Sequence, residues 1–487
     1  MEKIEDTVST AAPGGLKPTL STGRIIYMVV ACAAPMASVM GAVPVAFGLG
    51  NGAGVPLTFV GVATVLALFA VGYTRMSRRV VSTGAFYAYV IRGLGRIPGL
   101  GAAFLAIVSY AAYVAGAIAY FSFFARTALS DLAHIDIPWG WYALIGLAAI
   151  GVLGYRQIEF SSRLLMLLIT IEVGVLMVLN IAFIVHKGAS AFPLHSLSLS
   201  AVTSGAPGIA VMFGFTCFIG FESAALYSEE ARDPKRSVSR ATYGSLVVIA
   251  VFYLLTSWVT VGAVGASKIQ STALSDLGGL YFGLSDQYLA RWVTDLMEIF
   301  LATSLFATAL ALHNITARYV FALGRHKCLP TVLGRTHSRH GSPHAASIAV
   351  SVLATAVVGT CLILHVPPYI GLGAVAVGFG TVGIIALQGL TSLAVVGYFR
   401  RQRSTDVWRT IVAPLLGFAG LATAVALSLT KFSLLSGTDD RWINLIPCLL
   451  LAAFIAGISY AAWLRIKRPV VYHELGEELV EAAKATG

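Results

Sequence analysis

Residues 213–234 read Phe-Gly-Phe-Thr-Cys-Phe-Ile-Gly-Phe-Glu-Ser-Ala-Ala-Leu-Tyr-Ser-Glu-Glu-Ala-Arg-Asp-Pro. The first part of this stretch is an apolar run that is interrupted by glycines and contains a lone carboxylate, Glu222. An ionisable side chain inside an apolar membrane segment is costly unless it is paired or hydrated, so it marks a functional position. The stretch therefore predicts a membrane helix that is broken near its middle.

The composition of the whole chain is typical of a membrane protein. Of 487 residues, 57% are hydrophobic and 11% are charged, and the mean hydropathy is +0.82; soluble domains carry about 25% charged residues. Apolar stretches long enough to cross a bilayer as helices recur along the chain, without the alternation of barrel strands. The sequence predicts an all-α bundle of about twelve membrane helices. We place them at residues 24–47, 53–74, 98–126, 138–155, 161–186, 205–228, 240–264, 292–323, 344–365, 368–398, 410–430 and 441–465.

The basic residues predict the orientation. Residues 1–23 contain acidic side chains and no apolar core, so we expect a polar tail rather than a cleaved signal. If this tail is cytoplasmic, most of the 33 lysines and arginines lie on the inner side, and the outer side keeps Arg126, Lys187, Lys268, Arg291, Lys431 and Arg441. The positive-inside rule then predicts a cell-membrane protein with both termini, including the tail 466–487, in the cytoplasm. Anionic lipid headgroups account for the net charge of +11 without a nucleic acid partner.

A second interrupted span lies in the first half of the chain, at Ala33-Ala34-Pro35-Met36-Ala37-Ser38-Val39-Met40-Gly41. If the segments 24–186 and 205–398 are inverted repeats, the two breaks meet near the bilayer midplane. Backbone groups that a break leaves unpaired are tolerated there when they line a cavity or bind a ligand. Free N–H groups at the start of a half-helix suit a carboxylate, and unwound carbonyls suit an ammonium. The pair of breaks predicts an amino acid site; the alternative is two kinks that packing repairs.

Three motifs are similar to those of the amino acid, polyamine and organocation (APC) transporter family. They are residues 218–224 with Glu229-Glu230 and Asp233-Pro234-Lys235-Arg236-Ser237, residues 82–89 (Ser-Thr-Gly-Ala-Phe-Tyr-Ala-Tyr), and residues 322–330 (Ala-Leu-Gly-Arg-His-Lys-Cys-Leu-Pro). The resemblance covers nearly the whole chain. It implies a LeuT-like fold of five plus five helices in an inverted repeat, two extra C-terminal helices within 410–465, and transport by alternating access.

The first helix departs from the family pattern. The family commonly carries a Gly-x-Gly-Ile-Phe run there, and the aligned residues of this chain are Met36-Ala37-Ser38-Val39-Met40 after Pro35. A proline-containing break of this kind resembles the putrescine importers. A polyamine substrate therefore stays open as an alternative to an amino acid.

The residues of the two breaks and their neighbours are the candidate site. The candidate substrate-binding residues are Pro35, Met36, Ala37, Ser38, Tyr110, Thr216, Phe218, Gly220, Phe221 and Glu222. The two phenylalanines would stack on an ammonium, or belong to the core. Weaker polar candidates, which also suit helix packing, are Tyr113, Ser223, His313 and Asn314.

Two glutamates are candidates for ion coupling. The resemblance implies that Glu222 takes part in proton-linked exchange, as a matching glutamate does in arginine/agmatine antiporters; the alternative is a carboxyl that bridges carbonyls of the broken helix. Glu172 stands where proton-coupled relatives carry a lysine, so it would couple transport or only fix packing.

A transporter, a channel and an enzyme are the three candidate classes of function. A transporter explains the breaks, the repeat and the motifs together, whereas a channel would not need two helices broken at equivalent places. An enzyme would need a catalytic constellation, which the histidines do not provide, and the absence of a phosphate-binding loop argues against ATP. The cysteines lack metal-ligand spacing, so we expect no metal, cofactor or disulfide.

We therefore expect a permease that imports amino acids with protons, as a monomer or homodimer. A polyamine importer and an amino acid/amine exchanger are the alternatives. The charged loop 229–236 would latch the inner gate, or form a solvated turn.

Overall fold

The computed structural model describes residues 21–80, 85–156, 162–225, 234–337, 342–436 and 443–475. All regular secondary structure in these ranges is helical, because a chain in hydrocarbon must satisfy its backbone hydrogen bonds within each segment. Every one of the twelve predicted spans contains helix, so the all-α, multi-pass prediction is confirmed. Most of the charged loop 229–236, residues 82–84 of the second motif and most of both tails lie outside the described residues.

Among the described residues, ten helical stretches are long and apolar enough to cross a membrane. The main helices fall into two sets. In the first half they are α1 (Thr22–Cys32), the run from α2 (Pro35–Ala37) through α3 (Val43–Val45), α4 (Val55–Ser77), α6 (Arg96–Ala133), α7 (Trp139–Arg156), α8 (Ser162–Lys187) and α10 (Pro207–Thr216). In the second half they are α11 (Pro234–Val264), α14 (Arg291–Arg325), α15 (His344–Ile363), α16 (Val375–Arg401), α17 (Ala413–Leu429) and α18 (Cys448–Lys467). Shorter helices lie between or after them: α5 (Ala85–Leu94), α9 (Leu199–Val202), α12 (Ile269–Ser275), α13 (Leu280–Tyr288) and α19 (Pro469–Glu474).

Some helix ends differ from the hydropathy prediction because polar residues continue a helix beyond its apolar part. α6 runs past the expected end at Arg126 to Ala133 and includes Asp131. α11 begins at Pro234 instead of residue 240, since proline is well accepted in a first helical turn, where its missing N–H has no intrahelical partner. Hydropathy thus locates the part of a helix that suits lipid, not the whole helix.

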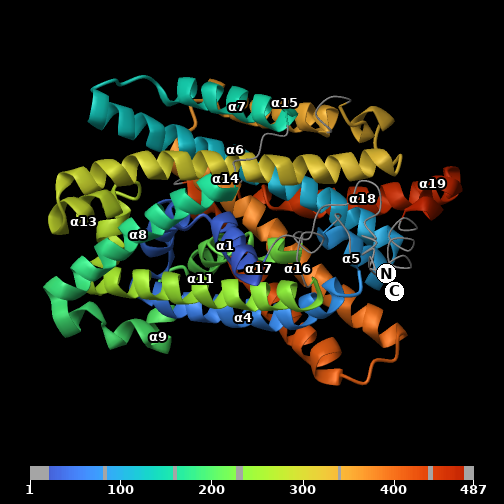
Figure 1. Cartoon of the computed structure of the whole chain (residues 1–487), viewed down its shortest axis with the longest axis horizontal. Coiled ribbons are helices and arrows are strands. Elements are labelled where there is room, and N and C mark those ends of the chain that lie inside the picture. The colour runs from blue at the N-terminus through green and yellow to red at the C-terminus, as the bar shows by residue number, and fades with distance from the viewer. Residues whose placement is uncertain are drawn as a thin grey trace, which may run out of the picture.

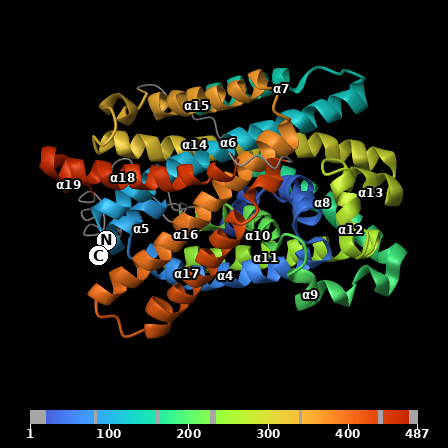
Figure 2. The ribbon, with the colours of Figure 1, turned by 180° about the vertical axis from the view of Figure 1, so that it is seen from behind.

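The broken helices lie in the middle of the bundle. In both views α7 and α15 lie side by side at one edge, α4 and α17 lie toward the other, and α1 and α10 lie between (Figures 1 and 2). α6 and α14 pack along each other, and α16 packs on α6. A Cβ at Gly380 of α16 would lie 2.7 Å from the Ser109 carbonyl oxygen of α6, so the lack of a side chain lets these two backbones approach closely.

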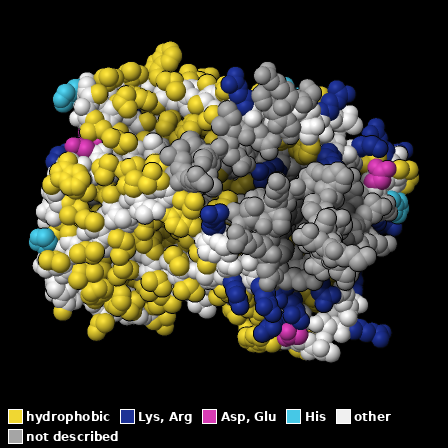
Figure 3. All heavy atoms as spheres, viewed as in Figure 1, with side chains coloured by type: hydrophobic (Ala, Val, Ile, Leu, Met, Phe, Trp, Pro, Cys, Tyr) yellow, Lys and Arg dark blue, Asp and Glu magenta, His cyan; other side chains and the backbone are white. Residues whose placement is uncertain are grey.

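The surface divides along the long axis of the molecule. Hydrophobic side chains cover much of the face in Figure 3, and Lys and Arg gather toward the end where α5 and α19 lie. Large apolar side chains are strongly exposed around the bundle, for example Val185 at 73% and Ile145 at 64%. Apolar exposure on this scale marks a surface that meets lipid rather than water.

Candidate functional site

The first helix break lies at Ala33 and Ala34. α1 ends at Cys32, and Ala34 adopts φ 44° and ψ 71°, a left-handed conformation that residues with a Cβ rarely take. Pro35 then starts the next helix. Residues 36–40, which the sequence prediction included in the break, are helical, partly with π geometry. They are helical because Pro35 stands in the first turn, where proline favours the start of a helix.

This break leaves a carbonyl group without a helical hydrogen bond, and side chains donate hydrogen bonds to it instead. The Ala33 oxygen accepts a hydrogen bond from Ser38 Oγ at 3.0 Å and from the Tyr253 hydroxyl of α11 at 3.3 Å. Ser38 and Tyr253 therefore hold the break open, and its geometry depends on a helix far away in sequence.

The second break follows α10. The helix ends at Thr216, a turn leads to Gly220 at φ +108°, and a short 3₁₀ segment covers residues 221–225. Local bonds shape the turn, including Ile219 N–H to the Thr216 oxygen at 3.2 Å and Ser223 N–H to the Gly220 oxygen at 3.0 Å. Glycine is the residue that adopts this positive φ without strain.

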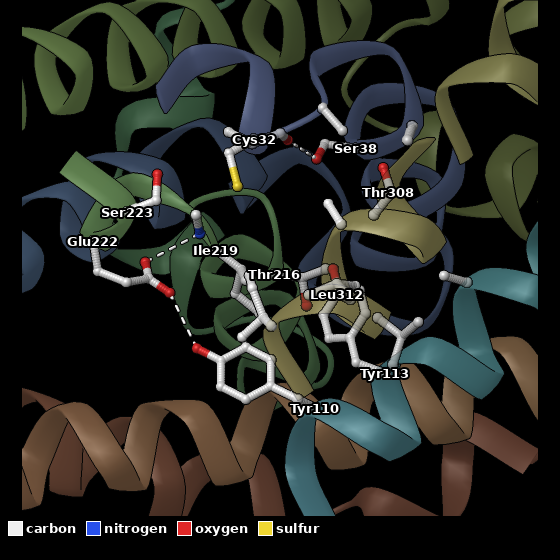
Figure 4. A pocket seen from close by; sticks show the side chains of 18 of the residues that line it. Cys32, Ser38, Tyr110, Tyr113, Thr216, Ile219, Glu222, Ser223, Thr308 and Leu312 are labelled. Atoms are coloured by element: carbon white, nitrogen blue, oxygen red, sulfur yellow. Dashed lines mark hydrogen bonds between the residues drawn. The ribbon is translucent and has the colours of Figure 1, made fainter. Parts of the chain in front are cut away.

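The two breaks lie against each other. A Cβ at Gly220 would be 2.9 Å from the carbonyl carbon of Cys32, the last residue of α1. Beside this contact lies a cavity of about 80 Å³, enough for more than one water molecule. Its walls come from both breaks and from α4, α5, α6, α14 and α16. Figure 4 shows side chains from the two breaks, α6 and α14 converging.

Glu222 brings a carboxyl group to the cavity. Its Oε2 accepts a hydrogen bond from Gly220 N–H at 3.0 Å, and the Tyr110 hydroxyl of α6 donates to Oε1 at 3.4 Å (Figure 4). The Tyr73 hydroxyl of α4 donates to the Glu222 backbone oxygen at 2.8 Å. The side chain is 9% exposed. Two hydrogen bonds to the carboxyl and one to the backbone oxygen thus fix Glu222 at the second break.

Aromatic rings surround this end of the cavity. The rings of Tyr110 and Tyr319 stack with centroids 5.7 Å apart, and Tyr87 lies 5.8 Å from Tyr319. Tyr110, Tyr319 and Tyr87 all line the cavity. The cavity near Glu222 is therefore lined by tyrosine rings.

Six of the predicted substrate-binding residues line the cavity: Ala37, Ser38, Tyr110, Thr216, Gly220 and Glu222. Of the weaker candidates, Tyr113 and Ser223 line it as well. The other four predicted substrate-binding residues are buried behind the cavity: Pro35, Met36, Phe218 and Phe221.

The two phenylalanines at the break pack into the core. Phe218 contacts the rings of Phe59 and Tyr253, at 6.4 and 6.0 Å between centroids, and Phe221 lies 6.0 Å from Phe69. They point away because the turn at Gly220 changes the direction of the chain, so helical periodicity does not predict which way they face.

Glu172 lies next to the cavity wall rather than in it. It is 3% exposed, and its Oε2 accepts a hydrogen bond from Ser304 Oγ of α14 at 3.0 Å. One turn further along α14, Thr308 lines the cavity and donates to the Ser304 oxygen at 2.8 Å. Ser304 therefore lies between Glu172 and the cavity wall, with one hydrogen bond at its side chain and another at its backbone oxygen.

His313 faces away from the cavity. Its ring is buried between helices and lies 2.9 Å from Ser351 Oγ of α15. A Cβ at Gly154 of α7 would lie 2.7 Å from the His313 ring. Asn314 does not line the cavity either. His313 therefore joins α14 to α7 and α15.

Sequence reasoning missed several residues at the site. They include Cys32, Tyr120, Thr308 and Tyr319, which all line the cavity. The spacing of Tyr110, Tyr113, Ala117 and Tyr120 on one face of α6 is the signal that would have found Tyr120.

A charged cluster lies where α6 ends and α14 begins. Arg291 at the start of α14 approaches Asp131 at 3.6 Å, Asp286 and Asp295 at 2.9 Å, and the buried Glu298 at 3.5 Å. These contacts tie the ends of α6 and α13 to α14. The hydropathy pattern of the sequence did not predict this charged cluster.

Comparisons with known proteins place this site in context. The family model described as "Amino acid permease" matches residues 20–455. The chain is 22% identical to the branched-chain amino acid permease BcaP of Bacillus subtilis over 318 residues, which cover 61% of this chain and 65% of the relative, just under two thirds of its length. It is 26% identical to the glutamate/serine transporter AimA of Bacillus subtilis over 31% of this chain and 27% of AimA. The human cystine/glutamate transporter is 21% identical over 62% of this chain and 60% of that protein.

Proposed function

The chain belongs to the amino acid permease family, and from this membership we propose that it imports amino acids across the cell membrane together with protons, by alternating access. The observation that carries the proposal is the cavity between two broken helices, with one buried carboxyl, Glu222, in its wall. Backbone groups freed at such breaks serve both ends of an amino acid.

The two ends of an amino acid find different partners at the breaks. Met36 and Ala37 follow Pro35 in a first helical turn, where N–H groups have no acceptor within the helix and the dipole favours negative charge. The substrate carboxylate is proposed to bind there. The ammonium group is proposed to bind at the end of α10 and at Glu222.

A polyamine is the second candidate substrate. A carboxyl in the cavity wall and Pro35 at the first break both suit an amine without a carboxylate. Glu172 would be the second partner that a diamine needs, although Ser304 now binds it. Uptake measurements decide between amino acid and polyamine.

Alternating access requires contacts that release on each side. At the end of α4 that leads to α5, the Arg78 side chain donates to Ser239 Oγ of α11 at 2.7 Å. On the other side, the Tyr369 hydroxyl donates to the Gly41 oxygen at 2.9 Å. In this proposal the two halves, 24–186 and 205–398, open one of these contacts at a time around the breaks, while the helices within 410–465 pack outside.

The proposal places both termini in the cytoplasm. The gathering of Lys and Arg at the end of the molecule where α5 and α19 lie supports it (Figure 3). A reporter that is active only in the cytoplasm, fused to the C-terminus, is expected to be active. An inactive reporter with an otherwise functional protein would reverse the orientation.

Transport by the purified protein tests the function. Proteoliposomes with an acidic exterior are expected to accumulate at least one radiolabelled amino acid, and dissipating the pH gradient is expected to stop accumulation. Uptake of putrescine or spermidine without any amino acid would select the polyamine alternative. Exchange without net uptake would select the exchanger, and neither uptake nor exchange would refute the proposal.

Substrate binding is expected to protect Cys32 from N-ethylmaleimide. Cys32 lines the cavity, whereas Cys448 is exposed at the start of α18 and does not. Labelling follows the unoccupied fraction, so a substrate at about ten times its Kd should slow labelling of Cys32 about tenfold. Peptide mass spectrometry measures both thiols. Equal labelling of Cys32 with and without a transported substrate would place the substrate elsewhere.

We also propose that Glu172 assists coupling through its hydrogen bond with Ser304, which lies one helical turn from Thr308 of the cavity wall. Glu172→Gln is expected to lower proton-driven accumulation several-fold while substrate exchange continues, because glutamine keeps the shape but cannot release a proton. Ser304→Ala removes the hydrogen bond and keeps the carboxyl, so its accumulation should fall less. A uniform loss of accumulation and exchange in Glu172→Gln would assign Glu172 to packing alone.

A further inference from the structure

Tyr120 lines the part of the cavity that lies furthest from Glu222 along α6. Tyr110, Tyr113, Ala117 and Tyr120 share the cavity-lining face of α6. With a rise of 1.5 Å per residue, Tyr120 begins about 15 Å beyond Tyr110 along the helix axis. Because helical side chains lean toward the helix N-terminus, the Tyr120 side chain leans back toward Ala117 and the middle of the cavity.

Close packing fixes the Tyr120 ring. Its centroid lies 5.0 Å from that of Tyr369. A Cβ at Gly373 would lie 2.6 Å from Tyr120 Cε1, and a Cβ at Gly41 would lie 3.9 Å from its Cδ2. With backbone on two sides and Tyr369 beside it, the ring cannot turn to bring its hydroxyl to another partner.

The Tyr120 hydroxyl has no hydrogen-bond partner among the described residues, although the side chain is only 4% exposed. Neighbouring tyrosines differ in this respect. The Tyr110 hydroxyl donates to Glu222, and the Tyr369 hydroxyl donates to the Gly41 and Leu277 oxygens. A buried hydroxyl without a partner is unfavourable, so the cavity presents Tyr120 to a polar atom that enters with the ligand.

The surroundings of Tyr120 indicate which ligand atom this is. Ala42, Leu305 and Val377 also line the cavity and offer only apolar side chains. The charged ends of an amino acid are assigned to the helix breaks, so the atom that meets Tyr120 belongs to the substrate side chain. We propose that Tyr120 determines substrate specificity by hydrogen bonding to the hydroxyl or amide of a small neutral polar amino acid. This inference rests on the proposed function.

Threonine and valine test this inference because they have nearly the same shape and differ by a hydroxyl. In proteoliposomes we expect kcat/KM for L-threonine to exceed that for L-valine by about tenfold or more, since a site built for a hydroxyl rejects the analogue without it. Tyr120→Phe keeps the ring and is expected to lower threonine uptake about tenfold, and valine uptake less than about twofold.

Tyr369→Phe is the matched control. It removes the hydroxyl of the ring next to Tyr120, but that hydroxyl binds backbone oxygens of the protein. Both substrates should change by the same factor, which leaves the threonine to valine ratio as in the wild type.

Two results would overturn the inference while the proposed function stands. One is an equal loss of threonine and valine uptake in Tyr120→Phe. The other is a wild type that transports amino acids but prefers valine to threonine and leucine to asparagine. Failure of the wild type to transport or exchange any amino acid would instead refute the proposed function itself.

Discussion

Replacing Glu222 by glutamine is expected to abolish proton-driven accumulation of substrate and to leave substrate exchange intact. Glutamine keeps the length of the side chain and an oxygen that can accept the hydrogen bond from Gly220 N–H. It cannot take up or release a proton. The variant should therefore bind and move substrate without coupling it to a proton gradient.

The size of the effect follows from the gradient. One proton moving down one pH unit supplies 1.36 kcal/mol, which supports about a tenfold accumulation. With a gradient of about two pH units the wild type can reach about a hundredfold accumulation, and the variant should stop near equal concentrations. Radiolabelled uptake into proteoliposomes measures accumulation, and counterflow of labelled substrate measures exchange.

Two controls separate coupling from structure. Glu298→Gln makes the same change at another buried carboxyl, which binds Arg291 and does not line the cavity, so accumulation should be as in the wild type. Tyr110→Phe removes a hydrogen bond to Glu222 and keeps the carboxyl, so it should alter the rate and not the final accumulation. If Glu222→Gln accumulates substrate to the wild-type level, Glu222 only bridges groups of the broken helix and does not couple protons.

The sequence predicted the architecture well because the bilayer imposes simple requirements. Spans must be long, apolar and helical, and Pro35 and Gly220 mark where two of them are interrupted. It did not predict that Ala34, which carries a Cβ, takes the left-handed conformation. That conformation depends on partners such as Tyr253, which binds the adjacent Ala33 carbonyl from a helix of the other half.

The site was predicted in part, for a physical reason. Polar residues such as Ser38, Thr216 and Glu222 stand out in apolar segments, and the structure brings them to one cavity. A helix surrounded by lipid and protein is apolar on every face, so periodicity does not distinguish the face that meets a cavity. Phe218 was included for this reason, whereas Tyr120 could have been found once Tyr110 and Tyr113 had marked one face of α6.

The close contact between the two breaks depends on Gly220. Its φ of +108° lies in a region that residues with a Cβ rarely adopt, and strain there costs about 1–3 kcal/mol. An added Cβ would also lie 2.9 Å from the Cys32 carbonyl carbon and 3.0 Å from Cys32 Cβ. Backbone atoms on the facing helix cannot move away as the end of a flexible side chain can.

We therefore expect Gly220→Ala to lower the uptake rate by about a hundredfold or more, because displacements of about 1 Å at a reacting or binding geometry have effects of this order. Thermal unfolding should show a loss of stability of about 2 kcal/mol or more, from strain and overpacking together. Gly174→Ala on α8 is the control, since its Cβ would meet nothing within 4 Å and alanine is a better helix former than glycine. Wild-type transport and stability in Gly220→Ala would mean that the breaks tolerate separation, and the cavity between them would not be the substrate site.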